Sequence, residues 1–343
     1  MNQSRRNLDI LKRRNAVLSA IRSFFSGRGY IEAETPLLAG AVIPEASIEL
    51  FSTSYRSPYA EGSDMYLLPS PEYYLKQLIA AGSGDIFCLS KCFRNSEQTG
   101  RWHNPEFTML EWYQMNANYL DSIATAEDLT GSLIENTEIR NFKGTDLKAL
   151  TPPFRRMSMT EVFDEFVSFD LSRHCTGEIS DEEQRAQLRA KAAELGLGTS
   201  SHDSWEELFN LIFVHEVEPN LPADSPLVIY NYPAGIPALA RPAEENGRLE
   251  RWELYAGSIE LANCYTEETD GSRIEEFFRS ETRGKAEALV PVKADLTWCG
   301  MYDGSFPDCS GTAMGIDRLI MLLTGIETIE GVILFPFSDI IRR

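Results

Sequence analysis

Residues 86–114 read IFCLSKCFRNSEQTGRWHNPEFTMLEWYQ, and this stretch decides the fold. Two largely apolar runs, Ile86–Phe93 and Phe107–Gln114, flank the polar segment Arg94–Glu106. Runs of this length on either side of a polar loop predict a β-hairpin. The connection is long for a hairpin, and long connections inside a compact domain are often functional. We therefore expect functional side chains in this loop and on the strand that follows it.

The second strand carries a carboxylate among apolar side chains. Alternation places Glu111 on one face with Phe107 and Met109, whereas Leu110 and Trp112 lie on the other face. Both faces are therefore at least half buried, and a buried carboxylate needs a partner. The alternative is an edge strand with a solvated glutamate.

Residues 311–318, GTAMGIDR, open an apolar helix that is predicted from Ile316 to Leu323. The small residues allow the backbone to approach a ligand. Arg318 lies in the first helical turn, where a cation is unfavourable unless an anion lies between it and the helix dipole. This segment thus favours an anion-binding site.

Glu253 and Glu260 are seven residues apart, which would place them on opposite faces of one straight strand. Ala256-Gly257-Ser258 can turn the chain and bring the two carboxylates together across a hairpin. Facing carboxylates suggest Mg²⁺, because hard cations take oxygen ligands and often bridge carboxylates to substrate phosphates. Surface acids on an acidic protein are the alternative interpretation.

The rest of the chain favours a single domain, 1–343, that carries an insertion. Apolar residues at helical spacing predict a helix over residues 8–25, followed by an extended piece that Pro36 closes. Ser70 and Pro71 are typical of an N-cap and a first helical position. The stretch at about 152–221 is rich in acids and alanine, which predicts a helical insertion.

The composition limits which partners and which cellular location we expect. The net charge is −20, whereas a protein that binds a polyphosphate backbone normally concentrates Lys and Arg on one face, so tRNA is an unlikely partner. Arg13 and Arg14 belong to a basic group on the first helix that either contacts an acidic partner or forms a solvated face. No leader-like segment or membrane-length apolar run is present, and six cysteines are too sparse for a disulfide scaffold, so we expect a cytoplasmic protein with reduced thiols.

Several segments resemble the catalytic domain of class II aminoacyl-tRNA synthetases of the lysyl type. The resemblance implies an α+β fold, a mostly antiparallel sheet flanked by helices, and a homodimer formed through Leu8 to Pro36. The segments that carry it are Gly29–Pro36 (first motif), Phe93–Arg94 with Arg101–Tyr113 (second motif), Gly311–Arg318 (third motif) and Ile259–Asn263 (lysyl signature).

The resemblance also implies residue roles. Arg94 and Arg318 would be catalytic, holding the ATP phosphates while the amino acid carboxylate attacks; that carboxylate is already ionised, so no base is required. Phe107 would stack on adenine, and Glu253 and Glu260 would bind Mg²⁺. The implied ATP site comprises Arg94, Ser96, Glu97, His103, Asn104, Phe107, Glu260, Leu261, Gly315 and Arg318. Either Ser96 or Glu97 fills the acidic position of the second motif, and Glu97 is favoured.

The implied lysine pocket comprises Ser70, Glu72, Glu111, Tyr113, Asn263, Glu267 and Ala313. Glu72 has a structural alternative, since an acid in a first turn also supports its helix.

One departure changes the expected acceptor. An anticodon-binding barrel would need about 100 residues, and no such stretch precedes the helix that leads to Pro36. The pattern resembles lysyl-synthetase paralogues that transfer (R)-β-lysine to a lysine of elongation factor P. Ala313, where lysyl-tRNA synthetases usually have glycine, is expected to shift preference between lysine isomers. The base that deprotonates the acceptor amine is not identified. A minimal lysyl-tRNA synthetase and a catalytically silent regulatory paralogue are the alternatives.

Overall fold

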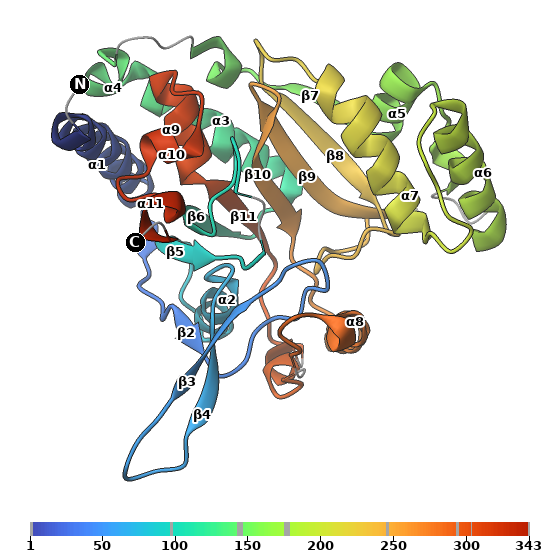
Figure 1. Cartoon of the computed structure of the whole chain (residues 1–343), viewed down its shortest axis with the longest axis horizontal. Helices are drawn as coiled ribbons and strands as arrows, with labels where there is room; N and C mark the ends of the chain where they lie inside the picture. Colours follow the sequence, from blue (N-terminus) through green and yellow to red (C-terminus); the bar gives the residue numbers. More distant parts are fainter. Residues whose placement is uncertain are drawn as a thin grey trace.

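A large sheet forms the centre of the molecule (Figure 1). The computed structural model describes residues 3–96, 99–142, 147–174, 179–244, 247–292, 295–302 and 304–341. The strands of this eight-stranded sheet are, in spatial order, β1 (Ile31–Glu32), β5 (Ile86–Phe93), β6 (Glu106–Met115), β11 (Cys309–Gly315), β10 (Ile259–Thr266), β9 (Arg248–Ala256), β8 (Leu227–Pro233) and β7 (Arg155–Ser158). Only the outer pairs, β1 with β5 and β7 with β8, are parallel. The expected α+β fold with a mostly antiparallel sheet is confirmed.

The predicted hairpin is β5 and β6, paired in antiparallel register from Ile86 opposite Tyr113 to Phe93 opposite Glu106. β6 lies inside the sheet, between β5 and β11, and its residues 108–113 are buried. A central strand is covered on both faces, so Glu111 is a buried carboxylate and not a solvated group at an edge.

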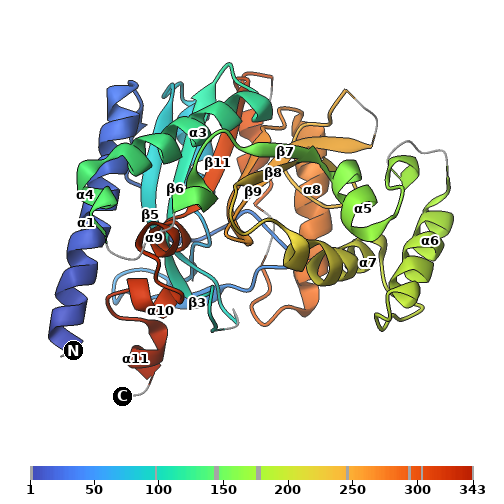
Figure 2. The same ribbon diagram turned by 90° about the horizontal axis from the view of Figure 1, so that it is seen from above.

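Helices cover both faces of the sheet (Figures 1 and 2). Trp112 belongs to a core with α1 (Gln3–Gly27), α3 (Tyr119–Glu135) and α9 (Ile316–Thr324). Tyr113 belongs to a second core with α2 (Glu72–Ala80), α8 (Gly271–Gly284) and the 3₁₀ turn η6 (Trp298–Tyr302). Adjacent residues of β6 thus point into different cores. The shorter helical elements are α4 (Thr137–Arg140), η1 (Leu147–Leu150), η5 (Lys285–Glu287), α10 (Ile329–Val332) and α11 (Phe337–Ile341).

Local sequence signals explain where two of these helices begin or end. α1 ends at Gly27, and Gly29 then adopts a left-handed φ of 86°, which glycine accepts without steric cost. α2 begins at Glu72, one residue later than predicted, with Pro71 at its N-cap. Ser70 still satisfies the helix start, because its hydroxyl accepts a hydrogen bond from the Glu72 amide at 3.4 Å.

The segment at 152–221 is mainly helical, but its first strand, β7, joins the main sheet beside β8. Its helices are α5 (Met159–Val167), η2 (Ser172–His174), α6 (Asp181–Glu194), α7 (Trp205–Ile212), the π-helical turn η3 (Phe213–Val217) and η4 (Glu218–Asn220). They form a separate apolar core against β8 and Tyr255 of β9. A small second sheet, β2 (Leu38–Ala39), β4 (Ser63–Leu67) and β3 (Phe51–Tyr55), projects away from the main body (Figure 1).

Two further expectations concern cysteines and membranes. The described cysteines, Cys88, Cys92, Cys264, Cys299 and Cys309, are free thiols. Within the described ranges, no helix has the length and apolar character needed to cross a bilayer.

Arg14 is not part of a solvated basic face. Its side chain is buried and donates to Asp317 at 2.5 Å, to Thr108 at 3.1 Å and to the Val332 carbonyl at 3.0 Å. Asp317 also accepts a hydrogen bond from the Thr108 amide at 2.6 Å. This network joins α1, β6, α9 and α10, and removal of one charge would leave the other buried without its partner.

We predict that Arg14→Met lowers the free energy of unfolding by about 3–5 kcal/mol, because Asp317 is left as an uncompensated buried charge. Arg13→Met is the matched control: Arg13 pairs with the exposed Asp9, and such pairs contribute less than about 1 kcal/mol. Urea unfolding of both variants measures the difference. Equal losses in the two variants would contradict a special role for Arg14.

Candidate active site

Two adjoining cavities open beside the centre of the main sheet. Arg94, Met109, Asn263 and Ala313 line both cavities, so the cavities meet at these residues. Asn263 and Ala313 are direct cross-strand neighbours on β10 and β11, and Ala313 is also opposite Glu111 on β6. The middle strands of the sheet therefore form the floor where the two cavities join. We call them the nucleotide cavity and the amino acid cavity, after the roles that the sequence predicts.

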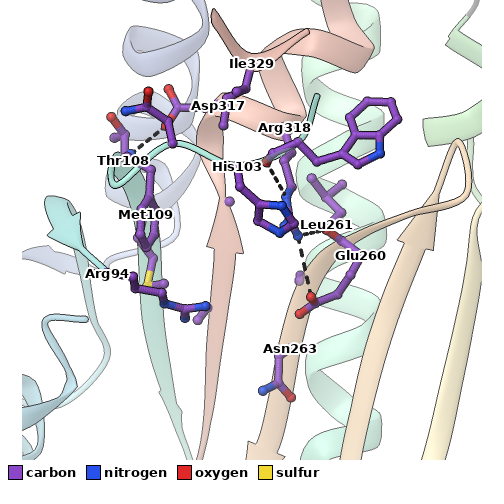
Figure 3. Close-up of a pocket in the computed structure, with 16 residues that line it drawn as sticks. Arg94, His103, Thr108, Met109, Glu260, Leu261, Asn263, Asp317, Arg318 and Ile329 are labelled. Carbon is purple, nitrogen blue, oxygen red and sulfur yellow. Dashed lines mark hydrogen bonds and ion pairs between the residues drawn. The ribbon is translucent and has the colours of Figure 1, made fainter. Parts of the chain in front are cut away.

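The nucleotide cavity gathers most of the residues predicted for ATP (Figure 3). Those that line it are Arg94, His103, Asn104, Phe107, Glu260, Leu261, Gly315 and Arg318. Ser96 is exposed and absent from this lining, and Glu97 lies outside the described residues. Segments from the loop before β6, from β10 and from the start of α9 thus converge, although they are far apart in sequence.

Arg318 is held in place by its neighbours. Its guanidinium donates to the Glu260 carbonyl at 2.6 Å, lies 2.8 Å from His103 Nε2, and is 3.5 Å from the Glu260 carboxylate. Of these three groups, the Glu260 carboxylate is the anion that an arginine in the first turn of α9 needs. They also aim the guanidinium into the nucleotide cavity (Figure 3).

Arg94 is held less completely. Its guanidinium carbon lies 5.4 Å from the centre of the Phe107 ring, and its Nε is buried without a hydrogen-bond partner in the part of the chain that the structure describes. A buried donor without a partner is costly. Because this donor lies where both cavities meet, an anionic group of a ligand would satisfy it.

Asn104 lines the nucleotide cavity, but its amide has backbone partners. It donates to the Glu106 carbonyl at 2.5 Å and accepts from the Phe337 amide at 3.1 Å. The side chain therefore also ties the loop before β6 to α11.

The amino acid cavity contains every residue predicted for the lysine pocket. The seven are Ser70, Glu72, Glu111, Tyr113, Asn263, Glu267 and Ala313. Tyr113 donates to Glu111 at 2.8 Å, and Tyr265 donates to Glu72 at 2.7 Å. The carboxylates converge as the sequence predicts.

A buried lysine lies behind these carboxylates. Lys76 is 1% exposed, and its Nζ is 2.5 Å from Glu72 and 2.7 Å from Glu267. Burial acts to lower the pKa of Lys76, but the charges of Glu267 and Glu72 outweigh burial and raise that pKa well above its usual value. The protein's own ammonium group therefore offsets part of the negative charge of the cavity.

Two carboxyl groups bind protons unusually tightly. Burial, reinforced by the charge of Glu72, raises the pKa of Glu111 well above its usual range, although the hydrogen bond from Tyr113 opposes the shift. Burial also raises the pKa of Glu267 to about 8, against the opposing charge of Lys76. These groups are poised to ionise when a cation enters.

Gly311 is required by this packing. A Cβ at this position would lie 2.4 Å from Glu267 Oε1 and 2.6 Å from Tyr113 Cε1. A side chain at residue 311 would therefore displace groups that line the amino acid cavity. By contrast, a Cβ on Gly315 would make only ordinary contacts, the nearest at 3.6 Å from Arg318.

Glu253 and Glu260 lie on the predicted hairpin, β9 and β10. The register places Glu253 opposite Asn263 and Glu260 opposite Tyr255, with a bulge between Glu260 and Ala262. Directly opposite residues of an antiparallel pair share a face, so Glu260 shares a face with Tyr255 and hence with Glu253, two residues away on β9. The bulge adds one residue to β10 beyond Glu260, and Asn263 therefore lies on the same face as these two carboxylates.

The surroundings of this pair suit a hard cation. Burial raises the pKa of Glu253 and the charge of Glu260 adds to the shift, while Arg251, 2.7 Å away, opposes it. The pKa of Glu218 is raised by burial and by the same two carboxylates. An oxygen-only set of mutually repelling carboxylates fits Mg²⁺. Across the described residues, no group of three or more His, Cys, Asp and Glu side chains is arranged to hold a metal ion.

Sequence analysis did not identify Glu45 and Tyr265, which line the amino acid cavity, or Lys76, which lies behind it. Lys76 had a signal, since it lies four residues after Glu72 on α2, which is the spacing of a helical ion pair. Tyr265 also had one, because it alternates with Asn263 along β10. Glu45, from the irregular segment 41–50, had none.

Comparisons with known proteins agree with this geometry. The family model described as tRNA synthetases class II (D, K and N) matches residues 2–339. A protein of Yersinia pestis (strain Pestoides F), named elongation factor P--(R)-beta-lysine ligase, is 35% identical over 334 residues, which cover 96% of this chain and 95% of the relative. The protein of the same name from Yersinia pseudotuberculosis matches with the same identity and coverage.

Proposed function

This chain belongs to the class II tRNA synthetases (D, K and N), and from that membership we propose that it activates (R)-β-lysine, or lysine, as the adenylate and transfers it to a lysine side chain of elongation factor P. It is an ATP-dependent amino acid ligase of the AMP-forming kind. The observation that carries the proposal is a cavity lined by buried carboxylates that meets the nucleotide cavity at Arg94. The names of the similar Yersinia proteins supply the acceptor.

Activation needs positioning and charge stabilisation. The substrate carboxylate attacks the α-phosphorus of ATP, and negative charge builds on the phosphate oxygens. Arg94, whose Nε lacks a partner among the described side chains, and Arg318, fixed by His103 and Glu260, would hold those oxygens. Loss of one such preorganised donor typically costs about 3 kcal/mol of barrier.

Glu253 and Glu260 would hold Mg²⁺, with Glu218 close enough to feel the same charge. The ion would neutralise phosphate charge when bound. Arg251 contacts both Glu253, at 2.7 Å, and Asn263, at 3.2 Å, and so fixes the metal-side carboxylate relative to the amino acid cavity.

The charge of the amino acid cavity suits a substrate with two ammonium groups. Glu72, Glu111 and Glu267 converge there, and once all three are ionised Lys76 offsets one of their three negative charges. A neutral or acidic side chain would leave these groups without a cation, which disfavours it strongly. Ala313 places a methyl group where the two cavities meet, and we propose that it contributes to the choice between lysine isomers.

The acceptor distinguishes the competing functions. We predict that the purified protein, with ATP and Mg²⁺, transfers radiolabelled β-lysine or lysine to elongation factor P and leaves tRNA nearly unlabelled. Label on tRNA alone would make the chain a minimal lysyl-tRNA synthetase. No label on either acceptor would favour a silent paralogue. Neither alternative is favoured by the similar proteins, which are named as ligases.

The raised pKa of Glu267 predicts pH-dependent binding. Below a pKa of about 8 the ligand-free carboxyl group holds a proton, whereas a bound ammonium group favours the carboxylate. Lysine affinity should therefore rise by up to about tenfold per pH unit between pH 6 and 8, and level off above that. Calorimetry in buffers of different ionisation enthalpy would count the released proton. Affinity that is constant over this window, with no proton released, would contradict the protonated pocket.

We also propose the predicted homodimer. Exposed apolar side chains on α1, on β1 and at the C-terminal end lie on the described surface and support a partner copy there. They include Leu8, Leu11, Ile31, Phe335, Ile340 and Ile341, between 48% and 70% exposed. We predict a dimer in gel filtration at micromolar concentration, and elution as a monomer would contradict it. The cytoplasmic location stays a prediction.

A further inference from the structure

Glu45 is a fourth carboxylate of the amino acid cavity. It lines the cavity with Glu72 and Arg94 but comes from the irregular segment 41–50. Resting on the function proposed above, we propose that Glu45 is the general base that deprotonates the acceptor lysine of elongation factor P before that lysine attacks the adenylate.

The segment that carries Glu45 is fixed on one side by α8 and η5. The Ala46 amide donates to Glu281 of α8 at 2.7 Å, and Lys285 donates to the Ile48 carbonyl. Gly284 packs so closely on this segment that an added Cβ would lie 2.7 Å from Ala46 Cβ. The backbone that directly follows Glu45 is thus tied to α8 and η5.

The other side is fixed by the loop after β5. The Asn95 amide donates to the Glu49 carbonyl at 2.8 Å, and its side chain donates to the Leu50 carbonyl at 3.2 Å. Asn95 directly follows Arg94, which lines both cavities. The segment that carries Glu45 is therefore held next to Arg94, and Glu45 itself lines the cavity that Arg94 shares with the nucleotide cavity, so a fixed group is available near the reacting centre.

Glu45 differs from the other carboxylates of the cavity in its partners. Glu72 and Glu267 pair with Lys76, and Glu111 accepts a hydrogen bond from Tyr113. Among the described side chains, none makes a hydrogen bond to the Glu45 carboxylate. Glu45 can therefore take a proton without disturbing the ion pairs or the hydrogen bond that hold the other three carboxylates.

Burial and neighbouring charges bring the pKa of Glu45 into the range that suits a general base. Burial raises its pKa to about 7, Glu72 and Glu281 add to the shift, and Arg94 and Lys285 oppose it. These groups face it from α2, α8, the loop after β5 and η5. A base is most effective when its pKa is near the working pH.

The step balances as follows. One proton of the acceptor ammonium passes to the Glu45 carboxylate, and the neutral amine attacks the adenylate carbonyl carbon. The new C–N bond forms, the adduct releases a second proton to solvent, and the bond from the carbonyl carbon to the phosphate oxygen breaks. AMP leaves with that electron pair and an amide remains. Glu45 returns its proton to solvent.

The test separates the two half-reactions. In Glu45→Gln, lysine-dependent ATP–pyrophosphate exchange should remain near wild type, because adenylate formation needs no base. Transfer to elongation factor P should fall by about 10²–10⁴-fold, the usual contribution of a general base. Trapping of the adenylate with hydroxylamine, which is already neutral at pH 7, should be retained. In wild type, the transfer rate should fall as pH drops below about 7, and Glu45→Gln should lose this step.

Glu45→Asp should recover part of the transfer, and Glu61→Gln, at an exposed site on the tip of the β3–β4 hairpin, is the matched control. Transfer at the wild-type rate by Glu45→Gln would refute the proposal that Glu45 is the general base. An equal loss of exchange, trapping and transfer would also overturn it and assign a positioning role. Failure of the proposed function looks different, since the wild-type protein would then leave elongation factor P unlabelled.

Discussion

The buried ion pair between Arg14 and Asp317 is the constraint on which the active site depends. Asp317 accepts from Arg14 and from the Thr108 amide, so one carboxylate fixes α9 against both α1 and β6. The next residue, Arg318, enters the nucleotide cavity, and Phe107, which precedes Thr108, lines the same cavity. Arg318 and Phe107 are therefore both positioned by the buried contact that their sequence neighbours Asp317 and Thr108 make. A buried pair of this kind adds little net stability, yet it fails badly when one partner is lost. Its value here is geometric, because it sets the positions of α1 and α9 relative to β6.

The amino acid cavity solves a different electrostatic problem. Converging carboxylates raise one another's pKa, and without a cation they would hold protons and bind an ammonium group weakly. Lys76 prevents full neutralisation by pairing with Glu72 and Glu267 at once. Glu111 is left with Tyr113 as its hydrogen-bond donor. The cavity thus keeps a charge that two substrate ammonium groups can match, with part of that charge released only on binding.

Sequence reasoning was strongest where periodicity and chemistry coincided. The hairpin around residues 86–114, the first-turn Arg318 and the pocket carboxylates follow from alternation, dipole arguments and resemblance, and the described structure brings these pocket residues together. The approach failed where a residue's partner is distant in sequence: Arg14 lies 303 residues from Asp317, so its basic neighbours on α1 made it look like part of a solvated face. Glu45 lies in a segment with no periodicity, where only tertiary contacts decide what a side chain meets. The bulge in β10, which places Asn263 on the face of Glu253 and Glu260, has no signal in the residue pattern either.

The two half-reactions explain why a protein-modifying ligase needs a group beyond those that form the adenylate. The carboxylate of the amino acid substrate is already ionised when it binds, so adenylate formation needs arginines to stabilise the phosphate charge but no base. The acceptor of the second step is an ammonium group, and a cavity built to attract ammonium groups stabilises that charged form and opposes its deprotonation. A carboxylate that forms a salt bridge with the acceptor ammonium group would stabilise its charged form further and make deprotonation harder. The base must therefore lie at the edge of the acidic cavity, close to the adenylate and free of the pocket's own pairs, and segment 41–50, fixed between α8 and the loop after β5, is where the fold places such a group.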